Sequence, residues 1–557
     1  MAVVLGGLLS SLWMTGCSSR SSTAKRVLIL TIDTLRWDRL GYTGYDIETP
    51  NLDALSETGT TFTQAITVTP LTLPSHASLF TSHYPSRHGV RSNGTFQLQS
   101  NAVTLAEVFR EAGFATGAFI GAFVLDRRFG LAQGFDHYDD ELPDEVRHKI
   151  YYAERPAKEV VSRAIDWIHA QEDESFFAWV HVFEPHAPYE PPLPFSEQYA
   201  DRMYDGEVAH TDQMIKPILD LVSSMEDSIV VVTSDHGESL GEHGETSHGL
   251  YIYDSTTRIP LVMNGSGVPK GLRIDAPVRI VDIAPTILDF AGYQFPGNTD
   301  GESLVPFLQE EPFPELDAYS ESFLPRYSFN WSEIRSLRRS GLKFIQAPKP
   351  ELFDLELDPR EGVNLMETSR ASEAVPLAAV LDQMIESQDP SGAKPLQLDQ
   401  SARRRLESLG YLSPNVVRTE GPVTKRVDPK DRIEVYEHMQ ELLSPELTAE
   451  QAIEGYRAIL ELEPTNTLSR NRLANTLAEE GRLQEAIEEY RQLVLDTEID
   501  FRGLDKLSAA LLLQGQTDEA LATTETAIAT APWNPDFHVL RGEALEQARR
   551  FDESKDA

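Results

Sequence analysis

The side chains of this chain that can do chemistry gather where predicted strands end. Asp33 closes one apolar run, Glu184 and His186 follow a second, and Asp235 with His236 ends a third. Parallel strands bring their carboxyl ends to one edge of a sheet, so residues far apart in sequence can converge there. Carboxylate and imidazole together suit Mn²⁺, Zn²⁺ or Fe better than Ca²⁺, which prefers oxygen.

A hydroxyl nucleophile is available in the segment Thr72-Leu-Pro-Ser-His76. A threonine hydroxyl reacts poorly at its own pKa and needs a metal ion to stabilise its alkoxide. Thr72 also fits a helix N-cap, Ser75 is a less favoured alternative nucleophile, and His76 is equally compatible with an ordinary helix position.

The elements that position these residues follow a strand–helix alternation, which predicts an α/β fold with a mainly parallel sheet between helices. The predicted strands are 26–33, 114–121, 176–183, 228–235 and 259–264. Residues 334–345 and 351–355 predict two short strands of a small antiparallel sheet.

Ordered motifs over residues 26–365 resemble the sulfatase branch of the alkaline phosphatase superfamily. They include Asp33-Thr-Leu-Arg-Trp-Asp38, Tyr84-Pro-Ser-Arg-His-Gly89, Ser234-Asp-His-Gly237, Leu240-Gly-Glu-His-Gly244 and Glu351-Leu-Phe-Asp-Leu355. The resemblance implies that Asp33, Asp235 and His236 bind a divalent metal (Mn, Zn, Fe or Ca) together with Thr72. Thr34 replaces the second Asp of the sulfatase pair.

Thr72 occupies the position of the sulfatase Cys or Ser that becomes formylglycine, and threonine cannot give that aldehyde. The segment also resembles the Thr-x-Pro-Asn-His motif of nucleotide pyrophosphatase/phosphodiesterases, which have an Asn 21 residues further on; Asn93 lies at that spacing. The resemblance implies that Asn93 donates to the transferring group, although Asn93-Gly94 also fits an ordinary turn.

The cationic residues that hold sulfate are replaced in this chain. His248 stands where a sulfatase has Lys and His76 where its motif has Arg, whereas His186 keeps the place of a sulfatase His near the ester. These changes indicate either degeneration or conversion to a phosphoesterase with a second metal near His248 and His186 or Glu184. His243 is interpreted as structural.

The predicted function is hydrolysis or transfer of a phosphate ester through Thr72. Sulfuric ester hydrolysis without formylglycine is one alternative, and a phosphoryl transferase acting on lipid or cell-wall glycan is another. A third is an inactive scaffold that binds partners through C-terminal repeats. The net charge of −39 argues against nucleic acid as a partner.

The N-terminus resembles a bacterial lipoprotein signal. A short apolar run precedes Met14-Thr-Gly-Cys17, and Cys17 is the only cysteine. This predicts a lipid-anchored protein of the bacterial cell envelope, facing the periplasm or the exterior.

Small residues recur at the C-terminus with a period of 34, as at Ala452, Ala486 and Ala520 and at Ala474, Ser508 and Gly542. The period predicts tetratricopeptide repeats that bind a protein or peptide. The predicted divisions are 1–17 (signal peptide and lipobox), 18–25 (tether), 26–365 (catalytic domain), 366–445 (linker and helical connector) and 446–557 (repeats).

Overall fold

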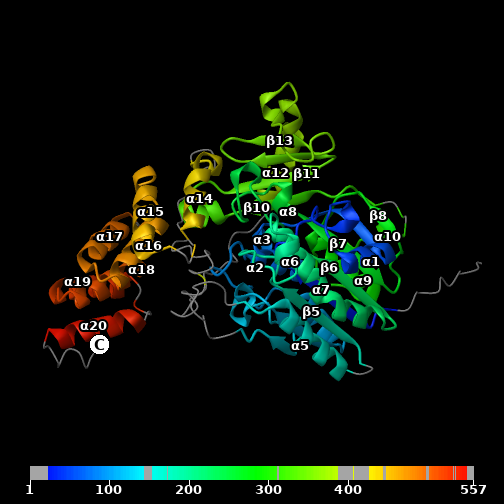
Figure 1. Ribbon diagram of the computed structural model, residues 1–557, viewed down its shortest axis with the longest axis horizontal. Coiled ribbons are helices and arrows are strands. Elements are labelled where there is room, and N and C mark those ends of the chain that lie inside the picture. Colours follow the sequence, from blue (N-terminus) through cyan, green and yellow to red (C-terminus); the bar gives the residue numbers. More distant parts are fainter. Residues whose placement is uncertain are drawn as a thin grey trace, which may run out of the picture.

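A computed structural model of the chain consists of an α/β body, a small sheet beside it and a helical array at the C-terminus (Figure 1). The structure describes residues 23–142, 154–171, 174–309, 311, 313–386, 406, 426–442, 444, 447–496, 501–530, 532 and 535–548. The predicted signal peptide with Cys17 and most of the predicted tether lie outside these residues.

The body is built on a nine-stranded sheet with the order β4-β3-β5-β1-β6-β7-β2-β8, and β9 also pairs with β2. Its strands are β1 (Arg26–Ile32), β2 (Thr60–Ile66), β3 (Ala115–Ile120), β4 (His137–Asp139), β5 (Phe176–Val182), β6 (Ser228–Thr233), β7 (Arg258–Gly265), β8 (Leu272–Ile274) and β9 (Val278–Arg279). Strands β4, β3, β5, β1 and β6 are parallel, whereas β7 is antiparallel to β6 and β2. The prediction of a mainly parallel sheet is therefore confirmed.

All five predicted strands of this sheet are present, as β1, β3, β5, β6 and β7. The apolar patterns did not predict β2, β4, β8 and β9. Strand β2 (TTFTQAI) is rich in polar residues, and the other three are too short to give a clear apolar pattern.

Helices cover both faces of the sheet. Those of the body and the small sheet are α1 (Pro50–Thr58), α2 (Thr72–Thr81), α3 (Pro85–His88), α4 (Leu105–Glu111), α5 (Ala157–Ala170), α6 (Phe195–Gln198), α7 (Met203–Ser223), α8 (Asp254–Thr257), α9 (Ile283–Ala291), α10 (Val305–Leu308), α11 (Leu324–Phe329) and α12 (Ala374–Glu386). Side chains of a strand alternate between faces. In β1, Val27 and Ile29 join the core under α2, α4 and α9, while Leu28 and Leu30 join the core under α1, α5 and α7.

The small antiparallel sheet has four strands rather than the predicted two. They are β10 (Ala318–Ser322), β11 (Ile334–Arg339), β12 (Leu342–Gln346) and β13 (Glu351–Asp354). The predicted strand 334–345 is two strands, because Ser340 and Gly341 both adopt positive φ and turn the chain between β11 and β12.

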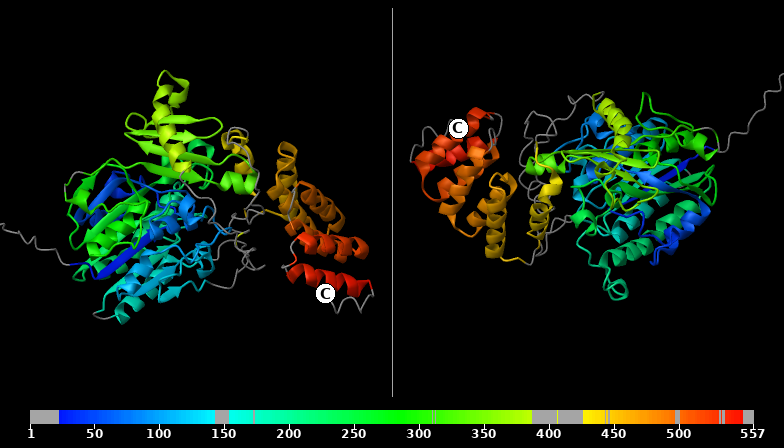
Figure 2. Two further views of the ribbon diagram at one scale, coloured as in Figure 1. Left: turned by 180° about the vertical axis from the view of Figure 1, so that it is seen from behind. Right: turned by 90° about the horizontal axis from the view of Figure 1, so that it is seen from above.

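The C-terminal part is helical. Its helices are α14 (Ile433–Glu441), α15 (Ala449–Leu462), α16 (Thr467–Glu479), α17 (Leu483–Asp496), α18 (Phe501–Leu513), α19 (Thr517–Thr530) and α20 (Pro535–Gln547). In both further views α15–α20 stack side by side, and α14 lies between this array and the body (Figure 2). The repeated small residues fall on alternate helices, and Ala474, Ala486, Ser508 and Ala520 are fully buried. The spacing thus coincides with a repeating helical unit.

Within the described residues, no helix has both the length and the apolar character needed to cross a membrane.

Candidate active site

Two neighbouring strands deliver the first residues of the candidate site to one edge of the sheet. Asp33 comes directly after β1, and Asp235 with His236 follows β6, the parallel neighbour of β1. The register pairs Thr31 with Thr233, so both strands end at the same level. The fold therefore brings Asp33, Asp235 and His236 together at the ends of these strands, as the sequence predicted.

Asp33, Asp235 and His236 offer a set of donors suited to a cation. Their ligating atoms all lie within 4.8 Å of one another. His236 Nε2 is 3.4 Å from Asp235 Oδ2 and 3.8 Å from Asp33 Oδ1. The Nδ1–H of His236 donates to the Gly237 carbonyl at 2.9 Å, which leaves the Nε2 lone pair facing the carboxylates.

The charges at this point also favour a cation. Both oxygens of Asp33 and Oδ2 of Asp235 are buried without a hydrogen bond in the described part of the chain. Burial, and then the charges of Asp235 and Glu238, raise the pKa of Asp33 well above its ordinary value, and burial raises that of Asp235. Two ligands bonded at about 2.0–2.2 Å to one ion lie roughly 2.8–3.6 Å apart. The 3.4 Å separation lies in this range and the 3.8 Å separation just beyond it, so the donors fit a divalent metal in kind and the site is slightly wider than a bound ion requires.

His181 is a further candidate ligand that the sequence analysis missed. It lies in β5, in register with Thr31, and its Nε2 is 3.4 Å from Asp33 Oδ2. Neither ring nitrogen has a hydrogen-bond partner among the described residues, and burial holds its pKa well below the usual range. The signal available in the sequence was a histidine inside an otherwise apolar strand, one residue before its end.

His76 is hydrogen-bonded to two residues that carry the site, Thr72 in α2 and Thr31 in β1. Its Nδ1–H donates to the Thr72 carbonyl at 2.8 Å, and its Nε2 lies 3.0 Å from Thr31 Oγ1. The Thr72 carbonyl can only accept, so Nδ1 carries the proton of the neutral ring and Nε2 accepts from the Thr31 hydroxyl, which itself accepts from Trp179 Nε1. Both nitrogens of His76 therefore bind the first turn of α2 to β1 in this arrangement.

Thr72 and Asn93 lie beside the cation set. Thr72 is the first residue of α2, it is buried, and its Oγ1 is 3.4 Å from His236 Nε2. Asn93 Oδ1 accepts from the N–H of Leu73 at 2.9 Å, which fixes the orientation of the amide. Asn93 Nδ2 is thereby left as a buried donor, with no partner in the described part of the chain.

His186 and His248 come together beside His236. Their Nε2 atoms are 3.2 Å apart, and the His248 ring lies 4.3 Å from that of His236. His186 Nδ1 bonds to the Ala187 carbonyl at 2.7 Å and His248 Nδ1 to that of Pro70 at 3.0 Å. Burial and then the neighbouring His248 lower the pKa of His186 to about 3, while burial and then His236 lower that of His248 well below its usual range.

Three other candidates lie outside this arrangement. Glu184 does not join the histidine pair through its carboxylate, because both oxygens accept from the N–H of Ala157 at 3.0 Å. Ser75 donates to the Asp235 carbonyl at 2.7 Å and is engaged there. His243 stacks on Tyr253 with 3.6 Å between ring centroids.

Comparison with known proteins identifies the family. Residues 25–293 match the model described as "Sulfatase", and residues 241–388 match that described as "N-sulphoglucosamine sulphohydrolase, C-terminal". This part of the chain belongs to the sulfatase family. Residues 25–388 thus carry a sulfatase-family hydrolase, as the sequence motifs indicated.

Similar proteins share this sulfatase-family region. The chain is 29% identical over 403 residues to an ulvan-active sulfatase of Formosa agariphila, covering 62% of this chain and 77% of the relative. It is 25% identical over 435 residues to a choline-sulfatase of Rhizobium meliloti, covering 62% and 83%. A phosphonate monoester hydrolase from Silicibacter pomeroyi has the same fold, with a TM-score of 0.56, 20% identity and coverage of 68% and 99%.

Proposed function

We propose that this sulfatase-family hydrolase cleaves phosphate esters with Thr72 as the nucleophile. The observation that carries the proposal is the position of Thr72 Oγ1, which is 3.4 Å from His236 Nε2 beside a buried cation-binding set. A hydroxyl at this position meets the requirement of a weak nucleophile, because a neighbouring cation favours its alkoxide.

In the proposed reaction Thr72 Oγ1 attacks phosphorus in line. The bond from Oγ1 to phosphorus forms as the bond to the leaving ester oxygen breaks. The Thr72 proton passes to solvent, the leaving oxygen departs with the bonding electron pair and takes up a proton from solvent, and a phosphothreonine results. Water or an acceptor alcohol then takes the phosphoryl group and regenerates the Thr72 hydroxyl. A divalent metal bound by Asp33, Asp235 and His236 would supply charge stabilisation for the alkoxide and the phosphoryl oxygens.

Asn93 and the histidine pair have separate parts in this proposal. Asn93 Nδ2 is oriented as a donor for a non-bridging oxygen, because Asn93 Oδ1 is held by Leu73. His186 would assist the leaving group through a cation bound at its Nε2, because its pKa of about 3 and the bond from Nδ1 to the Ala187 carbonyl leave no proton on Nε2 to donate. The 3.2 Å between the Nε2 atoms of His186 and His248 also matches two imidazole ligands of one ion, which supports a second cation there.

Sulfate ester hydrolysis is the second candidate function, and the family match and the sulfatase relatives favour it. The third candidate, an inactive scaffold, predicts neither metal binding nor turnover.

Turnover of three substrates decides among these functions. We would measure metal content and the hydrolysis of bis(p-nitrophenyl) phosphate, p-nitrophenyl phosphate and p-nitrophenyl sulfate. Thr72→Ala should abolish phosphate turnover, whereas Thr72→Ser should retain part of it because the hydroxyl remains. Thr81→Ala is the matched control, since Thr81 is an equally buried hydroxyl at the other end of α2 that donates to Ala77.

Predominant sulfate turnover would replace the phosphate proposal by its alternative. A protein that binds no metal and hydrolyses none of the three esters would be a scaffold. Turnover that survives in Thr72→Ala would exclude Thr72 as the nucleophile.

We further propose that the protein is lipid-anchored in the bacterial cell envelope through Cys17, with tetratricopeptide repeats at 446–557 that bind a protein or peptide. Membrane fractionation tests the anchor: Cys17→Ser should release the protein, and retention in the membrane fraction would refute the lipoprotein assignment.

A further inference from the structure

Three side chains of helix α14 contact three residues of the segment 244–248, namely Gly244, Thr246 and His248. The three side chains are Ile433, Tyr436 and Glu437, which lie at positions i, i+3 and i+4 and so share one helix face. A Cβ added to Gly244 would lie 3.2 Å from Ile433 Cγ1. Glu437 Oε1 accepts from the Thr246 N–H at 3.0 Å. Tyr436 Oη donates to the His248 carbonyl at 3.1 Å.

The same segment ends in the candidate site. The His248 ring contacts His236 and His186, and its Nδ1 bonds to the carbonyl of Pro70, two residues before Thr72. The main chain of His248 is thus held by α14 while its ring lies among the candidate catalytic groups. A shift of α14 would therefore move the ring directly.

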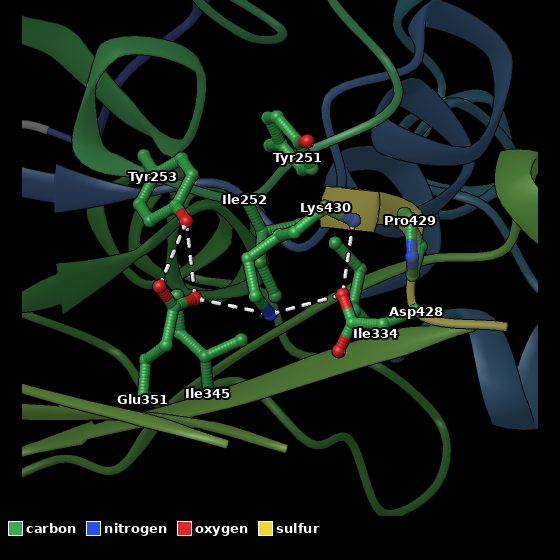
Figure 3. A pocket seen from close by; sticks show the side chains of 9 residues that line it. All are labelled: Tyr251, Ile252, Tyr253, Ile334, Ile345, Glu351, Asp428, Pro429 and Lys430. Carbon is green, nitrogen blue, oxygen red and sulfur yellow. Dashed lines mark hydrogen bonds and ion pairs between the residues drawn. The ribbon is translucent and has the colours of Figure 1, made fainter. Parts of the chain in front are cut away.

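The start of α14 is fixed on the small sheet. Figure 3 shows Lys430, three residues before α14, between Asp428 and Glu351 in a pocket beside β13. Lys430 Nζ is 3.2 Å from Asp428 Oδ1 and 3.4 Å from Glu351 Oε2, and Tyr253 Oη donates to the same carboxylate at 3.0 Å. The polar groups of this pocket pair with one another, so they attach the segment before α14 to β13 of the small sheet.

Helix α14 also contacts the helical array, through Met439, three residues after Tyr436. Met439 is buried with Ile459 of α15 and Leu468 of α16 in one apolar cluster, which also contains Leu71, the residue before Thr72. Trp331 Nε1 of the body donates to Glu463 Oε1, just after α15, at 2.7 Å. The array and the site therefore contact neighbouring side chains of one short helix.

From this geometry we infer that Tyr436 is a positioning residue for His248. We also infer that α14 makes the activity of the site depend on the position of the helical array α15–α20 against the body. The inference rests on the proposed function for its catalytic consequence. Its structural part, the restraint on 244–248, does not.

The test is a double-mutant cycle in the full-length, metal-loaded protein. Tyr436→Phe should lower kcat for the preferred p-nitrophenyl ester roughly five- to tenfold, with little change in KM, because one buried hydrogen bond is lost. In a His248→Ala background the same substitution should have almost no further effect. Tyr490→Phe is the matched control, since that buried Tyr donates to Asn475 inside the array at 2.8 Å.

Hydrogen exchange of the 244–250 peptide provides a readout independent of turnover. Tyr436→Phe should accelerate exchange there, and Tyr490→Phe should not. If the wild type hydrolyses none of the esters, the proposed function fails and the exchange experiment still decides the restraint. Unchanged exchange, equal losses of kcat in Tyr436→Phe and Tyr490→Phe, or losses that simply add in the His248→Ala background would overturn the inference.

Discussion

The metal-free protein should become more stable when Asp33 is replaced by Asn. Asp33 and Asp235 are buried, and their ligating atoms lie within 4.8 Å of each other. At an effective dielectric constant of about 20, two full charges at that distance repel each other by roughly 3.5 kcal/mol. The substitution removes one of the two charges. In chelator it should therefore raise the free energy of unfolding, whereas replacing an ordinary buried residue lowers it.

The effect should depend on pH in a definite direction. Protonating an ordinary aspartate takes about 5.6 kcal/mol at pH 8 and about 1.5 kcal/mol at pH 5. Burial and the neighbouring charges raise the pKa of Asp33, so the pair takes up a proton at a higher pH than an ordinary aspartate and bears the repulsion more fully as the pH rises from 5 to 8. A carboxyl with a raised folded pKa contributes stability at low pH that is lost as the pH rises. Chelated wild type should lose about 2 kcal/mol between pH 5 and pH 8, and Asp33→Asn should lose much less.

Urea unfolding in chelator at both pH values, and again with Mn²⁺ or Zn²⁺, is the assay. With metal the wild type should be more stable than Asp33→Asn, because the wild type keeps a metal ligand that the variant lacks. Asp282→Asn is the control: Asp282 is equally buried but paired with Arg279 at 2.6 Å, so its loss should destabilise the protein by about 3–5 kcal/mol. Destabilisation of the chelated protein by Asp33→Asn, or an equal effect at both pH values, would refute the reasoning.

Three further predictions concern single residues. Asn93→Ala should lower kcat by about 10²–10³ while metal content stays constant, because a donor to the developing charge is lost; steady-state kinetics with metal analysis checks this, and an unchanged kcat would leave Asn93 as a turn residue. His181→Ala should lower metal affinity in a competition titration, whereas affinity equal to the wild type would exclude His181 as a ligand. Burial and the charges of Glu184, Glu207 and Glu190 raise the pKa of Glu154 to about 8. Glu154→Gln should therefore stabilise the protein increasingly from about pH 4.5 to pH 8 in denaturant unfolding, and a constant difference would contradict this.

The sequence alone was sufficient to predict the sheet and the neighbourhood of the site. Long apolar strands that end in Asp33, Asp235 and His236 carry their own signal, since parallel strands must end at a common edge. Thr72, His186 and His248 were found through motifs whose spacing is local. The polar or very short strands β2, β4, β8 and β9 lacked such a signal, because pairing with neighbours rather than their own pattern makes them strands.

Only the tertiary structure decided how the candidate groups face one another. His181 is brought to Asp33 by the register of β5 with β1, and Asn93 is oriented by a backbone N–H twenty residues away. Nothing near Tyr436 in the sequence relates it to His248, which lies 188 positions earlier. These contacts depend on how whole elements pack. Local residue patterns therefore determined the kinds of groups in the site, and long-range packing determined their orientation and their neighbours.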